Sequence, residues 1–64
     1  MEMYRAFMLS RQASEEFLTA HTLMEHHDKK GADFYHRYAM SSLDKLAETL
    51  GLELVARENV EGGR

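Results

Sequence analysis

The sequence has no cysteine and no proline in its 64 residues. Without cysteine, neither a disulfide nor a thiolate zinc site can hold the fold together, and the chain suits a reducing cytoplasm. Without proline, the chain lacks the residue that most strongly breaks a helix from within. Chains this short usually need a disulfide, a metal or a partner subunit, because burial at about 25 cal/mol per Å² barely offsets an ordering entropy of about 1.5 kcal/mol per residue. A partner subunit is therefore the expected support.

Long apolar runs and a strong charge imbalance are also missing. The longest apolar run falls short of the roughly 20 residues of a membrane span, and the N-terminus has no signal-peptide pattern. The net charge is −3, with acidic and basic residues mixed, so we expect no direct contact with nucleic acid. These features predict a single all-α domain in the cytoplasm that does not enter a membrane.

The first of two helical segments is expected over about residues 10–30. Residues 1–9 are apolar and fit either an extended arm or the first turns of the same helix. Cationic side chains gather before Gly31, which could take the left-handed conformation that ends many helices. The helix follows from small and apolar side chains at steps of three and four, namely Ser10, Ala13, Phe17, Ala20, Met24 and His27.

The second helix is expected over about residues 33–50, with Asp33 as its N-cap. Gly51 directly follows the last periodic residue and favours a Schellman end, with Leu52 placed for the accompanying apolar contact. The periodic positions of this helix are Ala32, His36, Ala39, Leu43, Leu46 and Leu50.

Folding the chain at a turn over about residues 30–33 gives an antiparallel helical hairpin over residues 1–52, followed by a tail over residues 53–64. This turn sets Phe17 opposite Leu46, Ala20 opposite Leu43, Met24 opposite Ala39, and Ala13 opposite Leu50. Two helices cannot enclose these side chains on all sides, so we expect a homodimer that forms a four-helix bundle. The predicted core and dimer residues are Ala13, Phe17, Ala20, Met24, Ala39, Leu43, Leu46 and Leu50.

Neither a metal site nor a catalytic site is expected. The chain has four histidines, but it lacks both the His-Glu-x-x-His motif and the paired Glu-x-x-His motifs of di-iron bundles. Polar histidines at the end of the bundle are the favoured interpretation, with a histidine metal site as the alternative. The serines have no glycine elbow, and a chain this small offers little room for a concave pocket. We therefore predict a protein that is not an enzyme and that uses no cofactor.

The aromatic residues Phe34, Tyr35 and Tyr38 predict a protein-docking patch near the hairpin tip. Phe34 and Tyr38 lie one helical turn apart and point away from the leucine stripe, so both should be half exposed. Arg37 lies among them, and aromatic residues and arginine dominate the energetics of protein interfaces. The alternative is that these rings pack against residues 1–9 or against the other subunit.

Two resemblances bear on function. The segment Ser41-Ser42-Leu43-Asp44-Lys45-Leu46-Ala47-Glu48-Thr49-Leu50-Gly51-Leu52-Glu53-Leu54 resembles the closing part of Cro/CI-type helix-turn-helix domains, but the recognition helix is missing upstream. The Phe17 stripe and the Phe34, Tyr35 and Tyr38 patch, together with the small acidic hairpin, resemble the quorum-sensing anti-activator of Pseudomonas phages. That resemblance implies a phage-encoded inhibitor of a host protein such as a LuxR-type regulator, and also binding to a pilus-assembly ATPase. The alternative functions are a DNA-associated regulator and a histidine metal binder.

Overall fold

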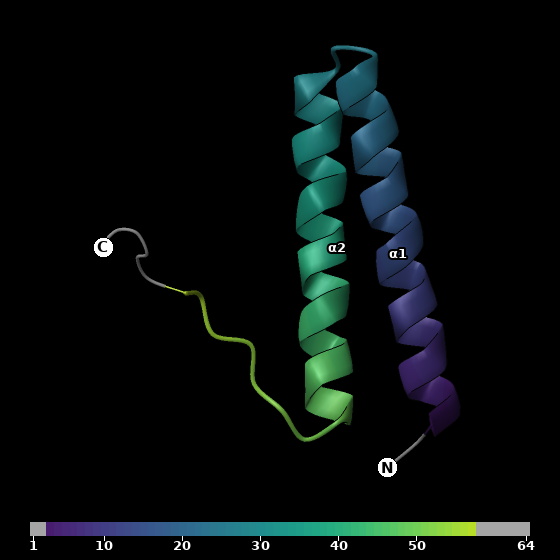
Figure 1. Ribbon diagram of the computed structural model, residues 1–64, viewed down its shortest axis with the longest axis vertical. Coiled ribbons are helices and arrows are strands. Elements are labelled where there is room, and N and C mark those ends of the chain that lie inside the picture. Colours follow the sequence, from purple (N-terminus) through teal and green to yellow (C-terminus); the bar gives the residue numbers. More distant parts are fainter. Residues whose placement is uncertain (1–2, 58–64) are drawn as a thin grey trace.

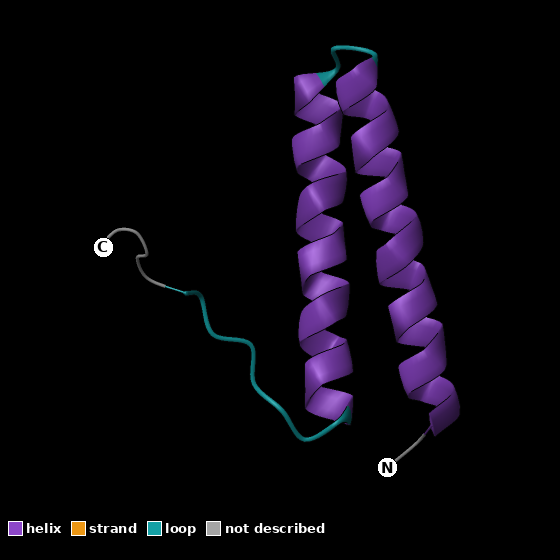
Figure 2. Ribbon diagram, viewed as in Figure 1, coloured by secondary structure: helices purple, strands orange, loops and turns teal. Residues whose placement is uncertain are grey.

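The computed structural model describes residues 3–57, in which two long α-helices lie side by side and antiparallel (Figure 1). Helix α1 spans Met3–Glu25 and helix α2 spans Lys29–Thr49. The described residues contain no strand, so the fold is an all-α helical hairpin (Figure 2). Residues 52–57 have no regular secondary structure and leave α2 on the side away from α1 (Figure 1).

The position of the turn corrects the sequence-based expectation. The turn occupies residues 26–28, not 30–33, and Asp28, not Asp33, is the N-cap of α2. Helix α1 begins at Met3, so residues 3–9 are helix and not an extended arm. Residues 1, 2 and 58–64, which include most of the predicted tail, lie outside the described part of the chain.

His27 and Asp28 close the first helix with a Schellman motif. The backbone of His27 has a φ of 62°, the left-handed conformation that was expected for Gly31. The Asp28 amide donates to the Leu23 carbonyl over 2.8 Å, and the His27 amide donates to the Met24 carbonyl over 3.0 Å. These bonds satisfy carbonyl groups that the helix end would otherwise leave unpaired.

Asp28 also begins the second helix. Its Oδ1 atom accepts a hydrogen bond from the Gly31 amide over 3.0 Å, which is the usual geometry of an aspartate N-cap. A Cβ atom at Gly31 would lie 2.5 Å from the other carboxylate oxygen, so the absence of a side chain at Gly31 makes room for the cap. One residue therefore ends the first helix and starts the second.

The end of α2 agrees with the prediction at Gly51. Gly51 has a φ of 76°, its amide donates to the Glu48 carbonyl over 3.0 Å, and the Leu52 amide donates to the Ala47 carbonyl over 2.7 Å. This is a Schellman motif with glycine at its left-handed position. The Leu52 side chain remains 63% exposed.

Small side chains form the interface between the two helices. Within residues 3–57, the buried residues are Ala13, Ala20, Ala32, Ala39, Ala47 and Ser42. No large side chain in that range is fully buried. Alanine occupies most of the positions at which each helix faces the other, so the large apolar side chains lie beside the interface. We call this row of small buried residues the alanine seam.

The predicted register of the hairpin is wrong because the turn comes earlier in the chain. The Phe17 ring lies against the His36 ring, with 5.8 Å between centroids, and does not lie opposite Leu46. Ser42 bonds to Glu16 across the interface over 2.8 Å. In both contacts, a residue of α1 meets a residue that comes earlier in α2 than the predicted pairing of Phe17 with Leu46 required.

The strained backbone of His27 generates a stability prediction. The left-handed conformation costs a residue with a Cβ about 1–2 kcal/mol and costs glycine almost nothing. We therefore expect His27→Gly to raise the free energy of unfolding by about 1 kcal/mol, measured by urea denaturation followed by circular dichroism. His26→Gly is the matched control, since His26 has no positive φ, and this variant should be no more stable than the parent. A loss of stability in His27→Gly would contradict the proposed role of the turn.

Candidate protein-binding surface

The hairpin is a single layer of helices with two different faces. Glu16 and Phe17 are neighbours in sequence and lie on opposite sides of the alanine seam, because successive helix residues are about 100° apart. Phe17 contacts His36 on one face, and Glu16 bonds to Ser42 on the other. We call the side of the hairpin that carries Phe17 and His36 the apolar face, and the side that carries Glu16 and Ser42 the polar face. Helical periodicity then places the other side chains on one face or the other.

The apolar face consists of Phe17, Met24, Met40, Leu43 and Leu50. Phe17 and Leu43 are half-buried, whereas Met24, Met40 and Leu50 are 53%, 42% and 39% exposed. Helical periodicity adds small residues and histidines to this face, and it places Lys29 and Asp33 at its end near the turn, seven residues before His36 and Met40. A largely apolar surface is unusual for the solvent-facing side of a helix pair.

The residues predicted to form the core divide into three groups in the single chain. Three of the predicted core residues are buried in the alanine seam: Ala13, Ala20 and Ala39. Phe17, Leu43 and Leu46 are half-buried, and Met24 and Leu50 are exposed. The hairpin thus encloses the small members of the predicted core and leaves the large members open on one side.

The predicted aromatic patch is brought together in the first turns of α2. The centroid of the Phe34 ring lies 4.7 Å from that of Tyr38 and 5.7 Å from that of Tyr35, and the two tyrosine rings are 6.1 Å apart. Phe34 and Tyr38 are 51% and 49% exposed, as the sequence predicted. Arg37, which is also exposed, lies three residues after Phe34 on the same helix. We call the three rings the aromatic cluster.

A polar groove adjoins the aromatic cluster through Tyr38. Ser42 is 4% exposed, and its hydroxyl donates to Glu16 Oε1 over 2.8 Å. This pair was not predicted from the sequence. Its signal is the helical spacing, since Ser42 follows Ala39 by three residues and Glu16 follows Ala13 by three. The groove offers hydroxyl, amide, carboxylate and ammonium groups beside exposed rings, and it is lined by Gln12, Glu16, Tyr38, Ser41, Ser42 and Lys45.

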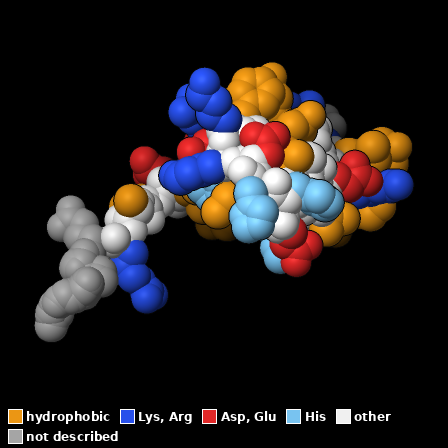
Figure 3. All heavy atoms as spheres, turned by 90° about the horizontal axis from the view of Figure 1, so that it is seen from above, with side chains coloured by type: hydrophobic (Ala, Val, Ile, Leu, Met, Phe, Trp, Pro, Cys, Tyr) orange, Lys and Arg blue, Asp and Glu red, His pale blue; other side chains and the backbone are white. Residues whose placement is uncertain are grey.

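The histidines do not gather into one site. His21 pairs with Glu25 over 3.5 Å, His26 Nδ1 lies 2.8 Å from the Thr22 carbonyl, and His36 packs against Phe17. Seen from the turn end, histidine side chains lie beside acidic and apolar groups (Figure 3). In residues 3–57, no three histidine, aspartate or glutamate side chains are grouped so that they could hold a metal ion.

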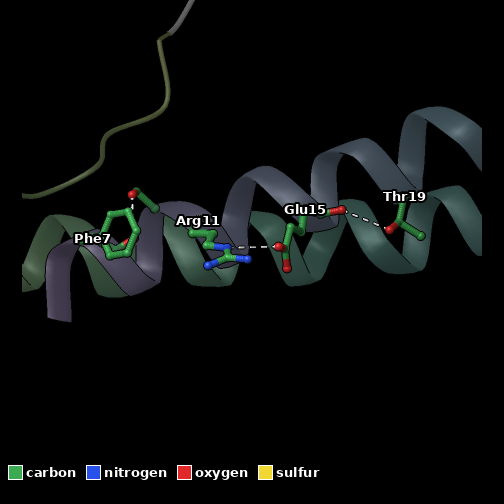
Figure 4. Close-up of polar contacts among 5 residues, drawn as sticks. Phe7, Arg11, Glu15 and Thr19 are labelled. Carbon is green, nitrogen blue, oxygen red and sulfur yellow. Dashed lines mark hydrogen bonds and ion pairs between the residues drawn. The ribbon is translucent and has the colours of Figure 1, made fainter. Parts of the chain in front are cut away.

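The outer side of α1 carries local polar contacts (Figure 4). Arg11 Nε lies 3.3 Å from Glu15 Oε2, and the Thr19 hydroxyl donates to the Glu15 carbonyl over 3.0 Å. The Ser10 hydroxyl donates to the Phe7 carbonyl over 2.8 Å. These bonds satisfy polar groups within one helix.

No protein-family model, no characterised protein and no solved structure matches this chain. Among the described residues, neither helix has both the length and the apolar character to cross a membrane.

The segment that resembles a helix-turn-helix ending forms the second half of α2 and the residues after it. In the described residues, α2 packs on an antiparallel helix and not on one at the steep angle of a helix-turn-helix motif (Figure 1).

The buried hydroxyl of Ser42 generates a second stability prediction. Ser42→Ala removes a buried hydrogen bond to a carboxylate, so it should be about 1 kcal/mol less stable than Ser41→Ala. Ser41 is the exposed neighbour on the same helix, so both variants gain the same helix propensity. Thermal denaturation of the two variants measures the difference, and equal stability would show that the Glu16 contact contributes nothing.

Proposed function

We propose that this protein is a homodimeric helical hairpin that binds another protein and inhibits it, without catalytic activity of its own. The observation that carries the proposal is the amount of large apolar surface left open by the hairpin. Phe34, Tyr38, Met24 and Met40 are 42–53% exposed, and no large side chain is fully buried within residues 3–57. A chain with only an alanine core needs a partner to bury these groups.

Dimerisation uses the apolar face in this proposal. Burying a leucine, methionine or phenylalanine side chain completely contributes about 1.5–3 kcal/mol, whereas the alanines of the seam contribute far less each. Two copies that meet face to face about a twofold axis bring Phe17 and Leu43 of each chain into one core. The product is a four-helix bundle with an isologous interface.

The dimer generates a prediction for Met40, which is 42% exposed on the apolar face. Met40→Glu should convert a micromolar dimer into a monomer, because the interface would bury an unpaired charge. Sedimentation velocity measures the change. Leu18→Glu is the control, since Leu18 is 64% exposed on the outer side of α1, and this variant should remain dimeric. A parent chain that is a folded monomer at micromolar concentration would contradict the dimer.

Partner binding uses the aromatic cluster. It adjoins the polar groove, which lies on the opposite side of the alanine seam from the apolar face, so it stays accessible when two apolar faces meet. Three packed rings next to hydrogen-bonding groups have the composition of a protein-interface hot spot. The resemblance to phage anti-activators makes a LuxR-type regulator in the host cytoplasm the first partner to test, and a pilus-assembly ATPase the second.

The aromatic cluster generates a binding prediction. Replacing both exposed rings, Phe34→Ala with Tyr38→Ala, should weaken binding to the regulator at least about tenfold while the helix content by circular dichroism stays the same. Isothermal titration calorimetry with a purified LuxR-type regulator measures the affinity. Leu18→Ala is the matched control and should bind as the parent does. Unchanged affinity in the double variant would exclude the aromatic cluster as the binding surface.

A further inference from the structure

His36 is a titratable side chain in the middle of the apolar face. Its ring lies edge-on against the Phe17 ring, with 5.8 Å between centroids and 72° between planes. Met40 and Leu43 follow His36 by four and seven residues on α2, so helical periodicity places them on the same side of the helix. In the single chain His36 is exposed. The imidazole is therefore open to water while its neighbours in the protein are apolar.

Self-association through the apolar face would change the surroundings of this ring. His36 contacts Phe17 and precedes Met40 by one helical turn, so a second copy that covers those two side chains also covers the imidazole. This step rests on the homodimer of the proposed function, and it does not depend on how the two copies are oriented. By twofold symmetry, each dimer would bury two His36 rings.

The charged groups closest to His36 on the apolar face form ion pairs with one another near the turn. On α2, Asp33 precedes His36 by three residues and pairs with Lys29 over 3.8 Å. On α1, His21 pairs with Glu25 over 3.5 Å. All four of these side chains are more than half exposed, and His36 itself forms no ion pair within residues 3–57. The charge on a protonated His36 is therefore stabilised mainly by water.

We propose that protonation of His36 dissociates the dimer, so that mild acid switches self-association off. A neutral imidazole can be buried among apolar side chains, whereas an imidazolium loses its hydration there without gaining a counter-charge. Protons therefore bind the monomer in preference to the dimer. The sign follows from this preference: the dimer is stable above the titration range of histidine and is lost as the pH falls through that range.

Two buried rings in each dimer make the response steep. Dissociation in acid takes up two protons, one on the His36 ring of each copy. For an ordinary histidine pKa of about 6.5, complete exclusion of the proton from the dimer raises the dissociation constant about a hundredfold between pH 7.5 and pH 5.5. A ring that keeps part of its hydration in the dimer gives a smaller increase. We therefore expect an increase of at least about tenfold.

The other histidines provide matched controls, because their surroundings differ from those of His36. The His21 side chain is 67% exposed beside Glu25, and the His26 Nδ1 atom lies 2.8 Å from the Thr22 carbonyl next to the turn. Neither ring has a contact like that between His36 and Phe17 among the described residues. Replacing His21 or His26 by glutamine should leave the pH dependence of the dimer unchanged.

Sedimentation velocity of the complete chain tests this proposal. A concentration series near pH 7.5, 6.5 and 5.5 gives the dissociation constant across the titration range of histidine. Two variants remove the titrating group: His36→Gln keeps a neutral polar side chain, and His36→Leu supplies an apolar one. We expect the parent and His21→Gln to dissociate in acid, whereas both His36 variants remain dimeric with the same dissociation constant at every pH.

Several results would overturn the proposal. One is a parent dimer whose dissociation constant changes less than about threefold between pH 7.5 and pH 5.5. A dimer that becomes stronger in acid would show that a carboxylate of the second copy pairs with the ring. An unchanged acid response in both His36 variants would assign the effect to another group, and loss of the dimer in both variants at pH 7.5 would assign the ring a packing role. A parent that is a folded monomer at pH 7.5 would instead contradict the homodimer itself.

Discussion

The close approach of two helices through small side chains is the constraint on which this molecule depends. Ala13, Ala20 and Ala39 occupy buried positions between the helices, and no phenylalanine or leucine is buried among residues 3–57. Large apolar residues are therefore displaced to the sides of the seam. A hairpin built in this way is a thin layer whose apolar side chains have neighbours on one side only, and that geometry is the reason for proposing a partner.

The turn decides which residues meet across the seam. Asp28 ends the first helix through its amide and begins the second through its carboxylate, and Gly31 leaves space for that carboxylate. Because only three residues connect the helices, the register has almost no freedom. The pairing of Phe17 with His36 on one face, and of Glu16 with Ser42 on the other, follows from this connection.

The apolar face and the aromatic cluster lie on different parts of one small hairpin. The aromatic cluster lies in the first turns of α2, near the hairpin turn and across the alanine seam from the apolar face. In the proposed dimer, this separation leaves the aromatic cluster open while the apolar face is used for self-association. Large apolar side chains exposed in this way are the observation behind the proposed binding function.

The sequence by itself determined the two helices, the end of α2 at Gly51 and the half exposure of Phe34 and Tyr38, because periodicity and local capping depend on nearby residues only. It did not determine the turn: Asp28 and Asp33 are both acceptable caps, and His27 in a left-handed conformation is locally less favourable than glycine. The tertiary structure settled that choice, since the earlier turn brings the alanines of both helices into contact. It also decided the Glu16–Ser42 pair and the separation of the two faces, which exist only once the register is set.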